Sequence, residues 1–184
     1  MPFKPRTPKP PLDEPALLEF AVRSLSSKMK SIRDLRRKLS ERATPGEEGT
    51  QQIDKVIAKL KDLGYLSDER FAADYTRLRK ENEKFGRRRV QQGLMQKGIA
   101  APVVNDAIGT AYDEIDEVAL ARQYIARKRM KQPEGDREKK QKETAKAMRR
   151  LVAAGFSIGT VWKVLRDWGA ELEEVDLEDS SMES

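Results

Sequence analysis

One pattern of apolar residues occurs three times along the chain, at intervals of 55 and 57 residues, and it constrains the fold more than any other feature. Each copy holds two apolar residues four positions apart, and in the second and third copies a glycine follows four positions later. The pairs are Leu35/Leu39, Val90/Leu94 and Ala147/Leu151, and the glycines are Gly98 and Gly155. A period of this length is typical of tandem structural repeats.

The match between the copies extends to a segment upstream of each pair. Here too, two apolar or aromatic residues stand four positions apart, which is the spacing of one face of a helix. These pairs are Ala16/Phe20, Phe71/Tyr75 and Leu120/Tyr124. A repeat of about fifty residues buries too little surface to be very stable alone, so neighbouring repeats should stack on one another. We therefore predict an all-α protein, an elongated array of three tandem three-helix repeats.

The composition agrees with this fold, because 38% of the residues are hydrophobic and 37% are charged. Such a balance suits helices with narrow apolar stripes and does not suit a buried parallel sheet. Stripes and stop signals place nine helices, with a loop at 43–50 and a capping box at Ser31 and Asp34. The predicted helices are 15–26, 31–42, 51–63, 67–80, 87–97, 101–112, 113–130, 137–154 and 157–168.

The repeats set the expected domain organisation. Six prolines in the first fifteen residues predict a disordered segment at the start, and an acidic stretch predicts another at the end. The expected boundaries are 1–14 for the proline-rich tail, 15–66, 67–112 and 113–169 for the three repeats, and 170–184 for the acidic tail.

The chain contains no cysteine and no histidine. This excludes Ser-His and Cys-His nucleophilic systems and the usual zinc sites. No phosphate-binding glycine loop occurs either. We therefore expect a protein that is not an enzyme and that uses no cofactor or metal. No signal-peptide pattern opens the sequence, and the longest uncharged helical stretch, 151–162, is too short to span a bilayer, so we expect a cytosolic protein.

The net charge of +6 is unevenly distributed. Residues 171–184 hold seven acidic side chains and no basic one, which leaves 37 basic against 24 acidic side chains in residues 1–170, a net charge of +13. A body this basic favours a polyanionic partner, either nucleic acid or a protein already bound to it. A solvated helical surface is the alternative explanation.

The middle helix of each repeat is its most basic element. If the paired apolar residues face inward, helical spacing turns the neighbouring basic side chains outward, including Arg33 and Lys146. Arginine suits carboxylates and phosphates alike. Arg87, Arg88 and Arg89 stand out because no acidic residue follows Glu83 locally to pair with them. The candidate partner- or DNA-binding residues are Arg36, Arg37, Arg87, Arg88, Arg89, Lys97, Arg149 and Arg150.

Two other sites are weaker candidates. Gln91, Gln92 and Gln96 could contact bases if the helices formed a helix-turn-helix reader, but the third helices carry no distinct base-reading set. Trp162 could contact a partner at an edge of the last repeat. The acidic cluster 113–117 is better explained as the first turn of a helix than as a cation site.

Two stretches resemble the hallmark motifs of the RecX family of bacterial regulatory proteins. These are residues 53–72, which include LGYLSDERFA, and residues 85–99, which include GRRRV followed by LMQKG. Residues 31–39 fit the same pattern. The resemblance covers roughly residues 16–168, and it is looser in the last third. The chain departs from the common pattern in its first loop, in an insertion near 131–138 and in its acidic tail.

The resemblance implies a function as well as a fold. Proteins of this kind bind the RecA recombinase filament on DNA and inhibit its ATPase and strand-exchange activities in recombination, DNA repair and the SOS response. We therefore expect a regulatory monomer whose basic face contacts the filament and nearby DNA phosphates. The alternatives are a helical module that binds DNA directly, without RecA, and a helical scaffold for another protein.

Overall fold

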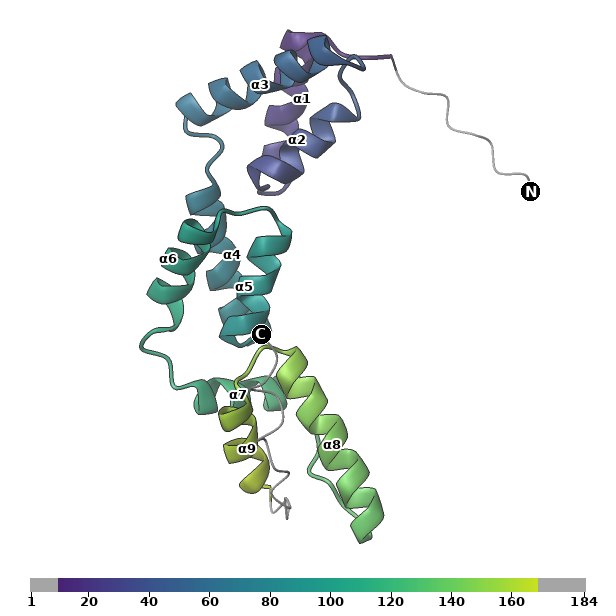
Figure 1. The fold of residues 1–184 in the computed structure, drawn as a ribbon, viewed down its shortest axis with the longest axis vertical. Helices are drawn as coiled ribbons and strands as arrows, with labels where there is room; N and C mark the ends of the chain where they lie inside the picture. The colour runs from purple at the N-terminus through teal and green to yellow at the C-terminus, as the bar shows by residue number, and fades with distance from the viewer. Residues whose placement is uncertain (1–9, 169–184) are drawn as a thin grey trace, which may run out of the picture. The chain divides into compact units, whose positions relative to one another are not determined.

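The computed structural model describes residues 10–168, and this part of the chain contains nine α-helices and no strand (Figure 1). The prediction of an all-helical chain with three-helix groups is confirmed. The helices are α1 (Glu14–Ser27), α2 (Ile32–Ser40), α3 (Glu47–Asp62), α4 (Asp68–Glu83), α5 (Arg87–Gln96), α6 (Ala101–Tyr112), α7 (Glu117–Arg127), α8 (Arg137–Ala153) and α9 (Ile158–Arg166).

The helices form two compact units. Unit 1 consists of residues up to 76 together with 93–110, and unit 2 consists of 77–92 together with residues from 111 onward. Helices α4 and α5 therefore each contribute one end to each unit. The two units are described separately below.

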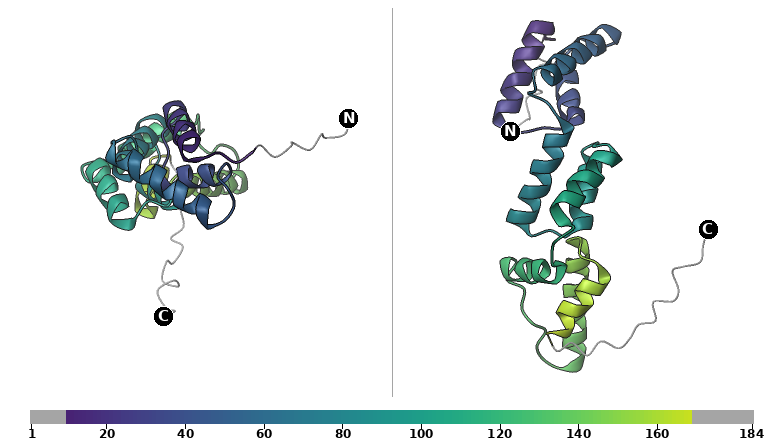
Figure 2. Two further views of the ribbon diagram at one scale, coloured as in Figure 1. Left: turned by 90° about the horizontal axis from the view of Figure 1, so that it is seen from above. Right: turned by 90° about the vertical axis from the view of Figure 1, so that its left-hand side faces the viewer.

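In unit 1, helices α1, α2 and α3 pack around one apolar core, and Figure 2 shows these three helices as one group. Leu17, Leu35, Leu39 and Leu60 have no exposed surface. Burying a leucine side chain completely stabilises a fold by about 1.5–3 kcal/mol. The pair Leu35/Leu39, which was predicted from the repeat, therefore lies at the centre of this core.

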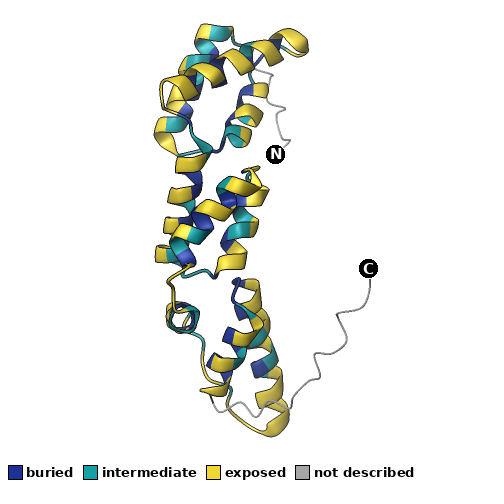
Figure 3. Cartoon of the chain, turned by 60° about the vertical axis from the view of Figure 1, so that its left-hand side comes forward, coloured by how far each residue is buried: buried dark blue, intermediate teal, exposed yellow. Residues whose placement is uncertain are grey.

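In unit 2, α9 packs against both α7 and α8. Leu151, Phe156 and Leu165 have no exposed surface. Tyr124 lies edge-on to Phe156 at 5.7 Å between ring centroids, a favoured aromatic geometry. The buried faces, dark blue in Figure 3, turn toward the inside of each helix group, while the outer faces are exposed.

The start of α3 differs from the prediction. Residues 43–50 were expected to form a loop, but α3 begins at Glu47 and includes Gly49. The chain turns at Gly46 instead, where φ is +104°, a conformation that glycine adopts without strain. Glu47 and Glu48 then lie in the first turn, where negative charge is favourable. Glycine and proline in 43–50 marked the turn correctly but not its length.

Helix α7 is shorter than the predicted helix 113–130. It begins at Glu117, because the carboxylate of Asp116 caps it by accepting hydrogen bonds from the N–H groups of Val118 and Ala119, at 2.9 and 3.1 Å. The interpretation of 113–117 as one acidic first turn is therefore wrong for all of its acids except Glu117. Helix α4 also differs, because it continues to Glu83 rather than ending near residue 80.

The capping box at the start of α2 forms only in part. Ser31 Oγ accepts a hydrogen bond from the N–H of Asp34 at 3.1 Å, as predicted. The Asp34 carboxylate is instead 2.7 Å from Lys97 Nζ. The acidic tail, 170–184, was expected to be disordered, and it lies outside the described residues, as do residues 1–9 of the proline-rich tail. Leu12 is described, and its N–H donates to the carbonyl of Arg42 at 2.7 Å.

Candidate partner-binding faces

Two candidate arginines lie on the exposed side of α2 in unit 1, and each faces a carboxylate. Arg36 Nη2 is 2.5 Å from Oδ1 of Asp54, and Arg37 Nη2 is 3.3 Å from Oδ1 of Asp34. The exposed fractions of the two arginine side chains are 44% and 75%. Ion pairs this open to water contribute about 0–1 kcal/mol. Both guanidinium groups can therefore exchange an internal carboxylate for one on a partner.

Lys97 also lies in unit 1, but it is more deeply engaged. Its Nζ is 2.7 Å from Oδ2 of Asp34, whose side chain is only 19% exposed. Its carbonyl oxygen accepts a hydrogen bond from Ser31 Oγ at 2.8 Å. Lys97 thus holds the end of α5 against the start of α2, and it is a fold residue as well as a candidate contact.

Arg87, at the start of α5 in unit 2, has a carboxylate partner that is distant in sequence. Its Nη1 lies 3.3 Å from Oδ1 of Asp113, and both side chains are more than half exposed. No acid stands near Arg87 in the sequence, but the fold brings in one that is 26 positions away, so Arg87 is not unpaired.

The other two arginines of the triplet are also exposed. Arg88 lies close enough to Glu117 to help lower the pKa of that carboxyl. Arg89 places its guanidinium 5.9 Å from the centroid of the Phe85 ring, a cation–π arrangement.

Arg149 and Arg150 are exposed on α8 in unit 2, and neither has an ion-pair partner within residues 10–168. The eight candidates thus divide between the units. Unit 1 contains Arg36, Arg37 and Lys97, and unit 2 contains Arg87, Arg88, Arg89, Arg149 and Arg150.

In each unit, the start of one middle helix contacts the end of the middle helix of the following repeat. We call this contact a junction. In unit 1, Ser31 Oγ donates to the carbonyl of Lys97, at the end of α5. Beside it, the backbone N–H of Ile32 donates to Oδ1 of Asp68 at 2.9 Å. The first N–H groups of a helix lack partners within that helix, so these contacts also satisfy the start of α2.

The junction in unit 2 repeats this arrangement with backbone groups. The N–H of Gly86 donates to the carbonyl of Ala154 at 2.9 Å, and the N–H of Arg88 donates to the carbonyl of Gly155 at 3.2 Å. Gly155 has φ of +94°, and a Cβ built there would lie 2.3 Å from the backbone N of Arg89. Only glycine fits so close an approach.

Asp68 and Glu117 occupy the same place in successive repeats, three residues before Phe71 and Leu120. Burial raises the pKa of Asp68 above its ordinary 3.8, against the lowering effect of the hydrogen bond from Ile32. The pKa values of the two equivalent carboxyls shift in opposite directions, because the pKa of Glu117 lies below its ordinary 4.5.

The lowered pKa of Glu117 follows from its partners. Burial raises the pKa, but several hydrogen bonds and the charge of Arg88 outweigh it. Ser157 donates to Glu117 from its N–H at 3.0 Å and from its Oγ at 2.6 Å, and Thr160 Oγ1 is a further donor. This carboxylate therefore fixes the start of α9 next to the arginines of α5.

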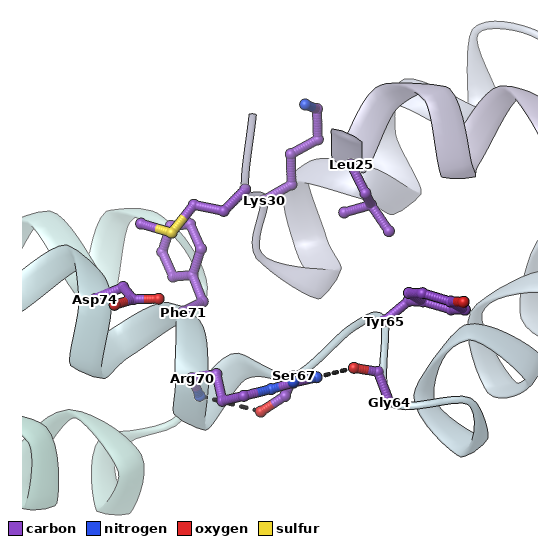
Figure 4. A pocket seen from close by; sticks show the side chains of 9 residues that line it. Leu25, Lys30, Gly64, Tyr65, Ser67, Arg70, Phe71 and Asp74 are labelled. Carbon is purple, nitrogen blue, oxygen red and sulfur yellow. Dashed lines mark hydrogen bonds between the residues drawn. The ribbon is translucent and has the colours of Figure 1, made fainter. Parts of the chain in front are cut away.

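Unit 1 also has a pocket of about 290 Å³ beside the turn between α3 and α4 (Figure 4). Arg70 donates to the carbonyl of Gly64, and Lys30 Nζ donates to the carbonyl of Ser24 at 2.7 Å, so both cations serve backbone carbonyls. The lining combines apolar, basic and acidic side chains and singles out no class of ligand. Its residues are Leu25, Met29, Lys30, Gly64, Tyr65, Ser67, Arg70, Phe71 and Asp74.

The weaker sequence candidates lie partly inside the fold. Gln92 and Gln96 are exposed on α5, while Gln91 is half-buried. Trp162 is half-buried on α9, beside the fully buried Val161. These placements leave base contacts by the glutamines and an edge contact by Trp162 as predictions.

Acidic residues form no group of three or more that could hold a metal ion anywhere in residues 10–168. Over the same stretch, no helix has both the length and the apolar character that crossing a membrane requires.

Comparison with known proteins agrees with this architecture. Residues 67–108 match the family model described as RecX, second three-helix domain. The regulatory protein RecX of Escherichia coli strain SE11 is 38% identical over 121 residues, which cover 61% of this chain and 69% of the relative. The protein of the same name from strain K12/DH10B has the same identity and coverage.

Two solved structures share the fold. A crystal structure of regulatory protein RecX aligns with a TM-score of 0.61 at 25% identity, covering 84% of this chain and 71% of that one. RecX from Lactobacillus salivarius aligns with a TM-score of 0.61 at 22% identity, covering 85% of this chain and 97% of that one, and it supports the fold alone.

The three-helix groups are joined by equivalent junctions, and basic side chains lie on the outer faces of the middle helices. These two features define a class of all-helical repeat proteins. The E. coli relatives and the family model narrow this class further. The chain belongs to the RecX family.

Several residues at these sites escaped sequence reasoning. The roles of Asp34, Asp68 and Glu117 depend on contacts across 36 to 63 residues. One signal was available: Asp68 and Glu117 occupy equivalent positions, so aligning the repeats beyond their apolar pairs would have singled them out.

Proposed function

We propose that this protein binds the RecA recombinase filament on DNA and inhibits recombinase ATPase and strand exchange, as a regulatory protein without catalytic activity. The observation that carries the proposal is the 38% identity to proteins named regulatory protein RecX. RecA regulation is the role that resemblance to this family implies. We further propose that the protein acts in the cytosol, as a monomer, through three repeats at 15–66, 67–112 and 113–169.

The available side chains agree with a binding role. The chain contains no histidine, which is the commonest general base, and no cysteine, whose thiol is a frequent nucleophile. The carboxylate of Glu117 accepts hydrogen bonds from Ser157 and Thr160 and fixes a helix start. Such a group is a structural anchor rather than a poised acid or base.

The exposed arginines are suited to reversible contacts. Arg87 and Arg36 form ion pairs that water reaches, so either can leave its internal carboxylate for one on the recombinase at small cost. Weak contacts made by linked repeats add up, because each bound contact raises the effective concentration of the next. We expect Arg87 and Arg88 to contribute directly, and Lys97 to contribute partly through the fold.

The test is inhibition of DNA-dependent ATP hydrolysis by purified RecA. The wild-type protein should slow hydrolysis at substoichiometric amounts, and the double variant Arg87→Ala/Arg88→Ala should inhibit more weakly. Its control is Arg23→Ala/Lys28→Ala, which removes the same charge from exposed positions of unit 1. An absence of inhibition by the wild type at every ratio would refute the proposal, and equal weakening by both variants would refute the assignment of the arginines.

A further inference from the structure

The pocket beside the turn between α3 and α4, which we call the unit 1 pocket, has a wall that local hydrogen bonds hold in place. The N–H of Tyr65 donates to the carbonyl of Leu60 at 2.8 Å, and the next residue, Leu66, is buried in the core of unit 1. Ser67 Oγ accepts from the N–H of Arg70 at 3.0 Å at the start of α4. The wall therefore needs no ligand to form, which lowers the cost of binding one.

The apolar part of the unit 1 pocket includes an aromatic ring that the fold leaves in water. Tyr65 is 64% exposed, the largest exposed fraction among the big apolar and aromatic side chains of residues 10–168. Phe71 is buried, and Leu25 and Met29 are half-buried (Figure 4). Exposed aromatic side chains beside apolar ones are typical anchors of protein interfaces, and methionine adapts its shape to a partner.

The two cations that line the pocket have no acidic partner within the described residues. Lys30 Nζ donates to the carbonyls of Ser24 and Lys28, at 2.7 and 2.9 Å. Arg70 donates to the carbonyl of Gly64. An ammonium group has three donors and a guanidinium group has five, so both side chains keep donors for a ligand. The positive charges are hydrogen-bonded but not neutralised.

The electrostatic environment of Lys30 also favours an added negative charge. Burial lowers the pKa of its ammonium group, and the charges of Lys38 and Lys28 lower it further, against a smaller opposite effect of Asp34. The lining contains two basic side chains and a single acidic one, Asp74. A ligand carboxylate would offset both the burial and the repulsion.

The residue types around the pocket do not by themselves identify a ligand, but size and charge together narrow the choice. The volume of about 290 Å³ lies at the lower end of the range of about 300–1,000 Å³ for small-molecule sites, and it suits one or two side chains. A nucleic acid backbone has no apolar group to place against Met29 and Phe71, and its phosphates would meet Asp74. An acidic peptide with an apolar side chain matches both parts of the lining.

We propose that the unit 1 pocket binds an acidic segment of a protein partner. Carboxylates of the segment pair with Lys30 and Arg70, and an apolar side chain between them packs on Met29 and Phe71 beside the ring of Tyr65. This goes beyond the proposed function, because it adds a peptide-docking site that is separate from the exposed arginines of the middle helices.

The test is fluorescence anisotropy with the full-length protein and a short labelled peptide in which glutamates flank a single phenylalanine. The wild type should bind this peptide saturably. Lys30→Gln/Arg70→Gln should weaken binding about tenfold, because two ion pairs are lost. Tyr65→Ala should weaken it about fivefold. Replacing the phenylalanine of the peptide by alanine should also reduce affinity.

Matched variants separate the pocket from net charge and from misfolding. Arg23→Gln/Lys59→Gln removes one arginine and one lysine from exposed positions of unit 1 outside the pocket, and it should bind like the wild type. Lys30→Arg/Arg70→Lys keeps both charges and should retain most of the affinity.

The proposal is overturned if the Lys30/Arg70 glutamine variant and the Arg23/Lys59 control bind the peptide equally well, or if the peptide without phenylalanine binds as tightly as the original. It is also overturned if a labelled oligonucleotide loses as much affinity for the pocket variant as the peptide does, because nucleic acid would then be the occupant. Because RecA is absent, these outcomes are independent of the ATPase test.

A further variant tests the chain's own acidic stretch as a competitor. Asp176→Asn/Glu178→Gln/Asp179→Asn should leave the affinity for the peptide unchanged. A clear gain in affinity would make that stretch the occupant, in place of a partner's segment.

Discussion

Glu117 on α7 and Ser157, the residue that caps α9, are joined by two hydrogen bonds to the two oxygens of one carboxylate. The Ser157 N–H donates to Oε1 at 3.0 Å and its Oγ donates to Oε2 at 2.6 Å. Through this contact the first helix of the last group determines where the third begins. The same carboxylate lies near Arg88, so a fold contact and a candidate binding residue are electrostatically linked.

We expect this contact to make stability depend on pH in the acid range. A carboxyl whose pKa is lowered on folding contributes fully above its unfolded pKa, near 4.5, and loses the contribution as the pH falls through the folded value. Glu117→Ala should lower the free energy of unfolding by about 2 kcal/mol at neutral pH, measured by urea denaturation. The difference between variant and wild type should shrink in acid.

The exposed neighbour Glu114 supplies the control, because Glu114→Ala should be close to neutral at every pH. An unchanged difference between Glu117→Ala and wild type on acidification would contradict the assignment.

Asp68 should behave in the opposite way. Its pKa is raised, mainly by burial, so its charged form is disfavoured in the fold. Stability attributable to this group is present below its unfolded pKa, near 3.8, and is lost as the pH rises through the raised folded value. Asp68→Asn keeps an oxygen that can accept from the Ile32 N–H and removes the charge. At neutral pH the variant should be as stable as wild type or more so, by thermal denaturation.

For Asp68→Asn the reference is Asp62→Asn, a change at an exposed residue that should have little effect. Marked destabilisation by Asp68→Asn alone would show that the charge itself holds the junction.

Gly155→Ala tests the close approach in the unit 2 junction. Alanine there would be strained at φ of +94° and would press against the backbone of Arg89, so we expect a loss of at least about 2 kcal/mol in the free energy of unfolding. Gly159 on α9 is the matched control, because a Cβ there meets nothing within 4 Å. Gly159→Ala should be neutral or stabilising by up to about 1 kcal/mol. Equal effects of the two changes would refute the packing described.

A double-mutant cycle on Lys97 and Asp34 tests the ion pair in the unit 1 junction. Because Asp34 is largely buried, we expect a coupling energy of about 1 kcal/mol, near the upper end for such pairs. The cycle on Arg23 and Glu19, which are both more than 70% exposed, should give about 0.3–0.5 kcal/mol. If the cycle shows no coupling between Lys97 and Asp34, the Lys97 side chain is free to act purely as a partner contact.

Local signals in the sequence predicted most of the fold. Gly98 and Gly155 end the middle helices at positive φ, as their place after the apolar pairs suggested. Leu39, Leu94 and Leu151 are fully buried. These features depend on residues a few positions apart, and periodicity captures such short-range relationships well.

The errors arose where long-range contacts or local helix caps decide. The sequence near Arg87 contains no acidic partner, and only the fold brings Asp113 to it. The start of α7 depends on the cap at Asp116 rather than on how many acids precede it. The candidate faces were predicted as exposed basic side chains, but only the structure shows which of these side chains, such as Lys97, already have a partner within the fold.

The early start of α8, at Arg137, also sets the last middle helix apart from the other two. At Ser31 and Gly86, carbonyls at the end of the next middle helix accept hydrogen bonds from a side-chain hydroxyl or a backbone N–H. These donors have no partner within their own helix. At Glu143, which stands four positions before Ala147 as Ser31 does before Leu35, the helix is already under way, so the backbone donors there are committed within α8. Within the described residues, the α8 extension therefore leaves no junction at Glu143 of the kind formed at Ser31 and Gly86.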